Sequence, residues 1–415
     1  MSNVKKYYII TTLYAIGFMF CSGAIAQGFL LKMGLSDSQV YTYTSLIQFA
    51  QVAVMVLMTF LSSTVKRVKR VSGISYMSLV ALAVVFLIGA LNPTMGGSSY
   101  ANLVFVVAAI CYGGLGVYMT MAYVLPYHII DMKDYGRITS MGAVFSGGTS
   151  FALSFLHTFV LTRFDFFRSS AWFFVLSILC FIFSAVVCLS MREKQSAVAP
   201  KKASRDEVVA VFKNRNTYIL LLPNFFRGIA AGIVAVIAVV AISQNILTEE
   251  KVSYLNIAMQ LCMLGGNFTY AMLCKKLSTT ALLLISTLAS CAFLPFVLVP
   301  SMAGFLVLFC VMYFFRLIMD TAIPVAVTEI IPKEQIGAYT SIRMLVFTGA
   351  QAVGALIITP IAGAIGYTGL LVFASVLQLI CGLSYYFVAV REKRLAKVLV
   401  EPQEELVKSV VEENA

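Results

Sequence analysis

The feature that most constrains this chain is a succession of long apolar segments that continues almost from end to end. Twelve such segments lie at roughly 7–31, 40–61, 73–91, 100–124, 138–162, 170–191, 217–243, 252–273, 280–299, 303–327, 340–363 and 369–390. About 20 apolar residues in a helix cross the ~30 Å hydrocarbon layer of a bilayer. Because lipid offers the backbone no hydrogen bonds, the segments must be helical. We therefore predict an all-α membrane protein of about twelve transmembrane helices.

The composition supports a lipid-facing exterior and argues against several other classes of protein. Hydrophobic residues make up 60% of the chain and charged residues only 12%, with a mean hydropathy of +0.92, whereas soluble domains are about 25% charged. The sequence contains no Walker lysine loop, no HExxH and no GxSxG motif. We expect no enzymatic activity, no cofactor and no metal site, and we interpret the nine cysteines as packing residues.

The distribution of basic residues predicts the orientation of the chain. Of the 30 Lys and Arg residues, only Lys32, Arg163, Arg168 and Lys251 fall in loops on the side opposite the N-terminus. Most of the others lie in loops on the N-terminal side, which the positive-inside rule places in the cytosol. We expect a plasma (inner) membrane protein with both termini cytosolic. Anionic lipid on the inner leaflet then accounts for the net charge of +12, with no need for nucleic acid.

Two regions of the chain repeat one pattern of residues. After the fourth segment come Pro126, Asp131, Gly136-Arg-Ile-Thr139-Ser140 and Gly148, and after the tenth come Pro324, Glu329, Gly337-Ala-Tyr-Thr340-Ser341 and Gly349. The matching order at equivalent segments indicates two six-helix bundles in parallel repeat. We divide the chain into an N-terminal bundle at 1–191, a cytosolic linker at 192–216, a C-terminal bundle at 217–390 and a cytosolic tail at 391–415.

With the basic loop at 65–70 between the second and third segments, this arrangement resembles the major facilitator superfamily over nearly the whole chain. The region after the fourth segment also resembles, more weakly, the glycoside–pentoside–hexuronide cation symporters. The first resemblance implies two bundles that rock around a midplane site. It also implies that helices 3, 6, 9 and 12 are peripheral and that the other eight line a central path.

The few charged groups at membrane depth are candidates for function because burying them is costly. Arg316 and Asp320 lie one turn apart on the tenth segment and can pair. Arg227 lies on the seventh segment, one turn after Asn224. These residues could form a proton-linked ion pair and an anion-recognising arginine in a cavity. Alternatively, they could be structural, with Arg227 meeting Asp320 between helices 7 and 10.

Uncharged polar groups supply the other candidates. Gln48, Gln51 and Gln260 would face the central path or bond one helix to another. His157 could titrate near neutral pH, although a satisfied interfacial histidine is the simpler interpretation. On the cytosolic side, salt bridges among the repeat-related Asp131, Asp134, Arg137 and Glu329 could close a gate, or these residues could simply be solvated.

These observations predict a secondary active transporter for a small polar or anionic organic solute. It would work by alternating access, coupled to a proton or to a cation such as sodium. A multidrug-type efflux transporter is the alternative and would need a larger, more apolar cavity. A membrane receptor or scaffold without transport is a further alternative and would need a packed interior.

Overall fold

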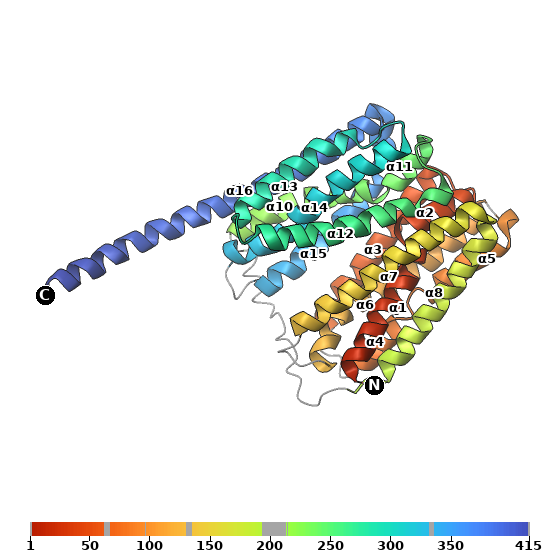
Figure 1. Ribbon diagram of the computed structural model, residues 1–415, viewed down its shortest axis with the longest axis horizontal. Coiled ribbons are helices and arrows are strands. Elements are labelled where there is room, and N and C mark those ends of the chain that lie inside the picture. Colours follow the sequence, from red (N-terminus) through yellow and green to blue (C-terminus); the bar gives the residue numbers. More distant parts are fainter. Residues whose placement is uncertain are drawn as a thin grey trace.

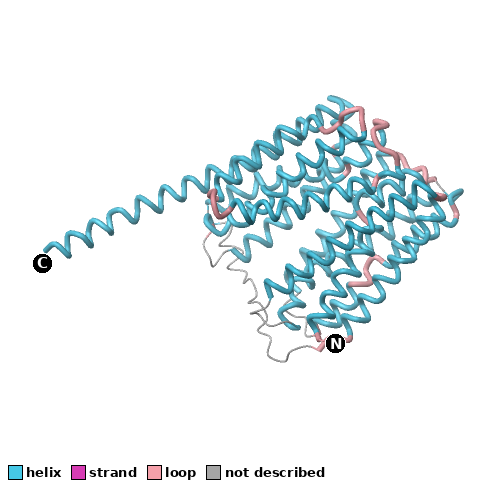
Figure 2. Tube along the Cα trace, viewed as in Figure 1, coloured by secondary structure: helices cyan, strands magenta, loops and turns pink. Residues whose placement is uncertain are grey.

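The computed structural model describes residues 2–61, 67–95, 97–129, 135–192, 213, 215–331 and 336–413. Throughout these ranges the regular structure is helical and contains no strand. Figure 2 shows these helices running side by side with short loops at their ends. The linker predicted at 192–216 falls almost entirely outside the described residues, so the domain boundaries there stay a prediction.

The first half of the chain forms six spans, of which the first and third are each built from two consecutive helices. The helices are α1 (Asn3–Cys21), α2 (Gly23–Lys32), α3 (Asp37–Leu61), α4 (Val68–Ser75), α5 (Val80–Leu91), α6 (Ser98–Ile129), α7 (Tyr135–Arg163) and α8 (Phe166–Leu189). Polar residues start several of them. Asp165, for example, accepts a hydrogen bond of 2.7 Å from the Arg168 N–H and so caps α8.

The second half repeats this order. Its helices are α10 (Arg215–Ala235), α11 (Ile237–Ser243), α12 (Ser253–Leu273), α13 (Thr279–Phe293), α14 (Met302–Ile330), α15 (Ile336–Leu356) and α16 (Ile358–Glu413). Gly366 has a positive φ of 72° within α16, which separates the end of the eleventh span from the twelfth. Beyond the bundle, α16 continues as the long projecting helix of Figure 1.

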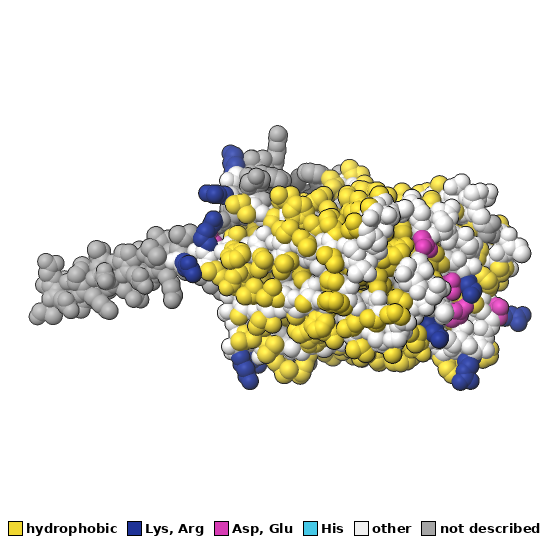
Figure 3. Space-filling model, turned by 90° about the horizontal axis from the view of Figure 1, so that it is seen from above, with side chains coloured by type: hydrophobic (Ala, Val, Ile, Leu, Met, Phe, Trp, Pro, Cys, Tyr) yellow, Lys and Arg dark blue, Asp and Glu magenta, His cyan; other side chains and the backbone are white. Residues whose placement is uncertain are grey.

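The number of spans agrees with the expected architecture. In the described ranges, nine helices are long and apolar enough to cross a membrane, and the bent pair Ile219–Ala235 and Ile237–Ser243 makes a tenth. The remaining two expected spans are α12 and α15, which are less apolar because they contain groups such as Asn256, Gln260 and Gln351. Figure 3 shows a wide hydrophobic band with charged side chains gathered at its two ends, as a bilayer requires.

Helix contacts repeat between the two halves. In the first half α1 packs on α7 and α8, and α3 packs on α6; in the second half α10 packs on α15 and α16, and α12 packs on α14. The halves meet through the pairs α3–α15 and α7–α12, which we call the seam. The repeat relates one pair of the seam to the other. The predicted all-α fold of two six-helix bundles in parallel repeat is therefore confirmed.

The halves are joined on the side opposite the N-terminus and spread apart toward the side of the N-terminus, as Figure 1 shows for α12 and α15 against α6 and α7. On the joined side, Ser243 donates a hydrogen bond to the Asp37 carboxylate, and Lys32 lies 2.7 Å from Glu250. Each of these contacts links one half to the other. The described conformation is therefore closed on the side opposite the N-terminus.

Small residues let α10 and α15 approach closely. A Cβ on Gly232 would lie 2.1 Å from the Gln351 carbonyl oxygen, and one on Gly228 would lie 2.5 Å from that of Phe347. Such contacts are typical of membrane helices whose glycines are spaced four residues apart. This packing fixes the rotation of α10 and therefore the direction in which Arg227 points.

Candidate functional site

A cavity of about 420 Å³ lies between the two halves. Its lining includes Gln48 and Gln51 from α3 and Asn256 and Gln260 from α12, so amide side chains from both halves face it. The full lining is Ala15, Phe18, Met19, Ser22, Gly23, Ala24, Ile25, Gln27, Tyr43, Thr44, Ile47, Gln48, Gln51, Tyr112, Ser150, Ala235, Asn256, Met259 and Gln260. None of these residues is charged. The predicted role of Gln48, Gln51 and Gln260 in binding a solute is a proposal developed below.

A second cavity of about 410 Å³ continues the first toward the N-terminal side. The two share Ala15, Phe18 and Gln51. The second cavity is lined mainly by α1, α6 and α7 and contains three tyrosines, Tyr7, Tyr14 and Tyr118. The rings of Tyr14 and Tyr118 are stacked, with centroids 4.1 Å apart. A polar chamber therefore opens through an aromatic one toward the side on which the halves are spread.

Hydrogen bonds around the polar chamber connect the two halves. Asn256 donates to the Ser154 hydroxyl over 2.7 Å, and Gln27 donates to the Ala235 carbonyl oxygen over 3.1 Å. The carbonyl oxygens of the Gln27 and Gln260 side chains are buried and accept no hydrogen bond from the described residues. Unsatisfied acceptors at this depth are costly, which makes them candidates to receive a donor from a solute.

The charged groups at membrane depth form a separate cluster within the second half. Arg227 on α10 pairs with the Asp320 carboxylate on α14, and the Arg316 Nε lies 3.9 Å from the other carboxylate oxygen. The Arg227 guanidinium also lies 4.7 Å from the centre of the Phe347 ring. The structure thus contains both pairings that the sequence left open, Arg316 with Asp320 and Arg227 with Asp320. The pairing between helices, Arg227 with Asp320, is the closer of the two. None of the three residues lines the two cavities described above.

Asn224 lies beneath this cluster and is completely buried. Its side-chain amide donates to the Arg343 carbonyl oxygen over 2.9 Å, which links α10 to α15. Arg343 is also buried, at 8% exposure. Its Nε has no hydrogen-bond partner among the described residues. The geometry of Asn224 is that of a bond between helices.

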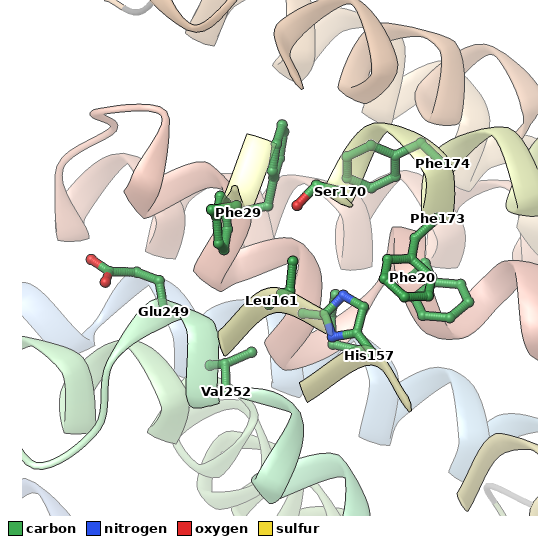
Figure 4. Close-up of a pocket in the computed structure, with 11 residues that line it drawn as sticks. Phe20, Phe29, His157, Leu161, Ser170, Phe173, Phe174, Glu249 and Val252 are labelled. Carbon is green, nitrogen blue, oxygen red and sulfur yellow. The ribbon is translucent and has the colours of Figure 1, made fainter. Parts of the chain in front are cut away.

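His157 lies in a small pocket of its own, shown in Figure 4. It is 3% exposed, its ring packs against Phe20 and Phe173 with centroids 5.3 and 4.6 Å away, and its Nδ1 is hydrogen-bonded to the Ser253 hydroxyl. In Figure 4 the Glu249 carboxylate points away from the imidazole. His157 is therefore placed as a bond between α7 and α12 at the seam, and it lies outside the polar chamber.

Little of the predicted cytosolic gate can be compared with the structure. Asp131 and Asp134 lie outside the described residues, and the Arg137 side chain is not described. Glu329 is exposed and accepts a hydrogen bond of 3.1 Å from the Thr279 hydroxyl. The ion pair that does join the two halves lies on the opposite side, between Lys32 and the Glu249–Glu250 pair. Since partial burial raises its pKa, Glu250 owes its lowered pKa mainly to the hydrogen bond from Lys32.

Some residues of the polar chamber are not among the candidates selected from the sequence. Gln27 is the most important of these, because it lines the chamber and bonds to the other half. Its amide within an apolar segment was a usable signal. The interruption of the first span at Ser22 was also missed, although a Ser-Gly pair in the middle of an apolar run is a recognised sign of a break.

Comparison with known proteins shows a similarity to one family of transporters. The model of the Major Facilitator Superfamily matches residues 220–412, and solved transporters share the fold over both halves. The second half of the chain therefore resembles the major facilitator superfamily in sequence, and both halves share the fold of solved transporters. No curated protein sequence matches it.

Several solved structures of this superfamily are similar to the chain at low sequence identity. The nucleoside transporter NupG has a TM-score of 0.67 at 16% identity, covering 94% of this chain and 99% of its own. The fucose:proton symporter FucP of E. coli has a TM-score of 0.60 at 15% identity, with coverages of 94% and 99%. A D-xylose-proton symporter has a TM-score of 0.66 at 12% identity, with coverages of 92% and 96%. These structural similarities establish the fold of the chain.

Proposed function

We propose that this protein is a secondary transporter that moves a small, neutral, hydroxyl-rich solute across the membrane by alternating access. The observation that carries the proposal is the polar chamber between the halves, whose lining offers amides and hydroxyls and no charge. A hydroxyl group both donates and accepts, so it can satisfy amide N–H groups and amide carbonyl oxygens at the same time. The nucleoside, fucose and xylose transporters that share the fold support this class of solute.

The chamber favours a neutral solute over the anionic one that the sequence left open. A carboxylate or phosphate accepts hydrogen bonds only, so it would leave the carbonyl oxygens of Gln27 and Gln260 unsatisfied. The arginines that could neutralise an anion lie outside the chamber, and Asp320 already engages two of them. A packed scaffold is disfavoured by the presence of the chamber, and an efflux transporter for large apolar compounds is disfavoured by its amide-rich lining.

Coupling to a proton belongs to the proposal through Asp320. It is the acid of the buried charge cluster, and 29% of its side chain is exposed, so a proton could reach it. Protonation would remove the partner of Arg227 and change the contact between α10 and α14. The orientation with both termini cytosolic and the location in the inner membrane are part of the same proposal.

Uptake into proteoliposomes tests this function. Purified protein is assayed with radiolabelled D-xylose, L-fucose, uridine and gluconate, with and without an inward proton gradient. Uptake of at least one neutral compound, increased by the gradient, is expected. Gln48→Leu and Gln260→Leu should each reduce it by about tenfold or more, the effect of a hydrogen bond lost at a buried site. Asn92→Ala, at the exposed end of α5, is the matched control and should leave uptake unchanged.

Three results would contradict the proposal. Uptake of gluconate alone would show an anion transporter. Movement of ethidium in place of all four compounds would favour drug efflux. Full uptake by both glutamine variants would show that the solute does not bind in the polar chamber.

A further inference from the structure

Two repeat-related spans are interrupted at corresponding places. The first span breaks at Ser22, between α1 and α2, and the seventh breaks at Val236, between α10 and α11, where the helices are bent by 42°. An interrupted helix leaves backbone N–H and C=O groups without helical partners. At membrane depth such groups are tolerated only where protein buries them or where they line a cavity.

The break in the seventh span is only partly buried in protein, because Ala235 is exposed and lines the polar chamber. Val236 has no exposed surface, and the preceding carbonyl oxygen, that of Ala235, accepts a hydrogen bond of 3.1 Å from the Gln27 side chain. The neighbouring Ile237 is also buried. This break is therefore closed by a side chain from the other half of the protein.

The break in the first span is open to the polar chamber. Gly23 is exposed, its φ is +56°, and a Cβ built on it would meet nothing within 4 Å. Ser22, Gly23, Ala24 and Ile25 all line the chamber. Both breaks therefore reach the chamber, but the carbonyl oxygen at the seventh-span break already accepts a hydrogen bond from Gln27, whereas the break in the first span is open.

The open break presents the uncapped N-terminus of α2. The first N–H groups of any α-helix have no partner within the helix and form its positive end. Ser22 occupies the capping position, but its hydroxyl donates to the Phe18 carbonyl oxygen over 2.6 Å and makes no cap hydrogen bond. The N–H groups of Gly23, Ala24 and Ile25 therefore belong to residues that line the chamber, and they have no acceptor among the described residues.

An unsatisfied acceptor lies one turn further along the same helix. Gln27 is 3% exposed, and its Nε2 donates to the Thr44 hydroxyl over 3.2 Å and to the Ala235 carbonyl oxygen. Thr44 donates its own proton to the Val40 carbonyl oxygen, so it must accept from Gln27. These bonds fix the orientation of the amide and leave its Oε1 without a donor. Backbone donors and a side-chain acceptor thus lie on one helix beside the chamber.

We propose that the interruption of the first span is a backbone binding site for a hydroxyl group of the solute. The hydroxyl oxygen accepts from the N–H groups of Gly23 to Ile25, and a proton of the same or the adjacent hydroxyl is donated to Gln27 Oε1. A neighbouring pair of hydroxyls, as in a sugar or a ribose, satisfies both sides. This assignment rests on the proposed function, since it names the place where that solute is held.

Occupying the free N–H groups tests the assignment. Ser22→Asp places a carboxylate at the capping position, where it accepts from the first N–H groups of α2. Binding of tritiated D-xylose and uridine to the purified protein should weaken by about tenfold or more, as for loss of a buried hydrogen bond. Ser278→Asp is the matched control, because Ser278 caps α13 outside both chambers and already accepts from the Ala281 N–H.

A second variant removes an N–H group without adding charge. Ala24→Pro deletes one donor at a position in the first turn, where proline is compatible with a helix. Ala24→Val has comparable bulk and keeps the donor. The proline variant should bind the two compounds about tenfold more weakly than the valine variant.

Hydrogen exchange separates failure of this site from failure of the proposed function. Peptides covering residues 22–26 should exchange rapidly in the protein alone, more slowly in Ser22→Asp, and more slowly when a bound compound is present. If neither compound binds while exchange is rapid, the proposed function fails and the break remains open. If a compound binds and neither Ser22→Asp nor Ala24→Pro weakens it, the backbone site is refuted.

Discussion

Replacing Asp320 by asparagine should destabilise the protein because it leaves two arginines buried without a carboxylate. The Arg227 side chain is 9% exposed, that of Arg316 is 11% exposed and that of Asp320 is 29% exposed. Removing one partner of a buried ion pair costs about 3–5 kcal/mol. Because Asp320 is partly exposed, we expect the lower end, about 3 kcal/mol, for Asp320→Asn.

Most of this loss of stability should come from leaving the Arg227 guanidinium without its carboxylate partner. Arg316 lies on the same helix at 3.9 Å, and such i,i+4 pairs contribute about 0.5 kcal/mol or less. Arg316→Gln should therefore cost less than Arg227→Gln. The double variant Arg227→Gln with Asp320→Asn removes both charges of the close pair, and it should be more stable than Asp320→Asn alone.

Equilibrium unfolding in mixed detergent–SDS micelles, followed by circular dichroism, measures these differences. The decisive quantity is the coupling free energy of the double-mutant cycle, which we expect to exceed about 1 kcal/mol. The reasoning is wrong if Asp320→Asn unfolds at the same SDS fraction as the parent protein. It is also wrong if the effects of the two single substitutions simply add.

Two further predictions concern the joined side and the helix packing. Glu250 has a lowered pKa, so its ion pair with Lys32 stabilises the closed side above the ordinary glutamate pKa of about 4.3, and this contribution is lost as the pH falls through the lowered value. The mobility of a nitroxide spin label attached beforehand at Ser38, which is exposed beside this side, should rise between pH 7 and pH 3.5, and Glu250→Gln should remove the part of that rise due to this pair. Gly232→Ala should destabilise the protein by about 1–3 kcal/mol, because the added Cβ would lie 2.1 Å from a backbone oxygen. Gly148→Ala is its control, since nothing lies within 4 Å there, and equal unfolding of the two variants would contradict the packing argument.

The sequence predicted the spans and their repeat because both depend on average composition and order. Twenty apolar residues require a helix in lipid whatever their neighbours are. The amides Gln48, Gln51 and Gln260 were found for a related reason, since polar groups within such helices must face protein or a cavity. The structure places all three beside one chamber.

The partners of the charged residues could not be read from the sequence. Whether Arg227 faces the chamber or Asp320 depends on the rotation of α10, which is fixed by the contacts of Gly228 and Gly232 with α15. Spacing along one helix gives the Arg316–Asp320 pair, but the closer contact with Arg227 depends on tertiary packing. The open break at Gly23 was missed for a similar reason, because its openness depends on what lies opposite.

The hydrogen bonds at the α7–α12 part of the seam have a consequence for the energy of the proposed conformational cycle. Asn256 bonds to Ser154, and His157 bonds to Ser253, so the described contacts there join dipoles and leave no isolated charge when they separate. A neutral hydrogen bond exchanged for one to water changes the free energy by only about 1 kcal/mol. Water entering between these helices would repay most of what their separation costs. In the proposed transport cycle the two end states can therefore lie close in free energy, so that modest differences in solute affinity would be enough to drive the exchange.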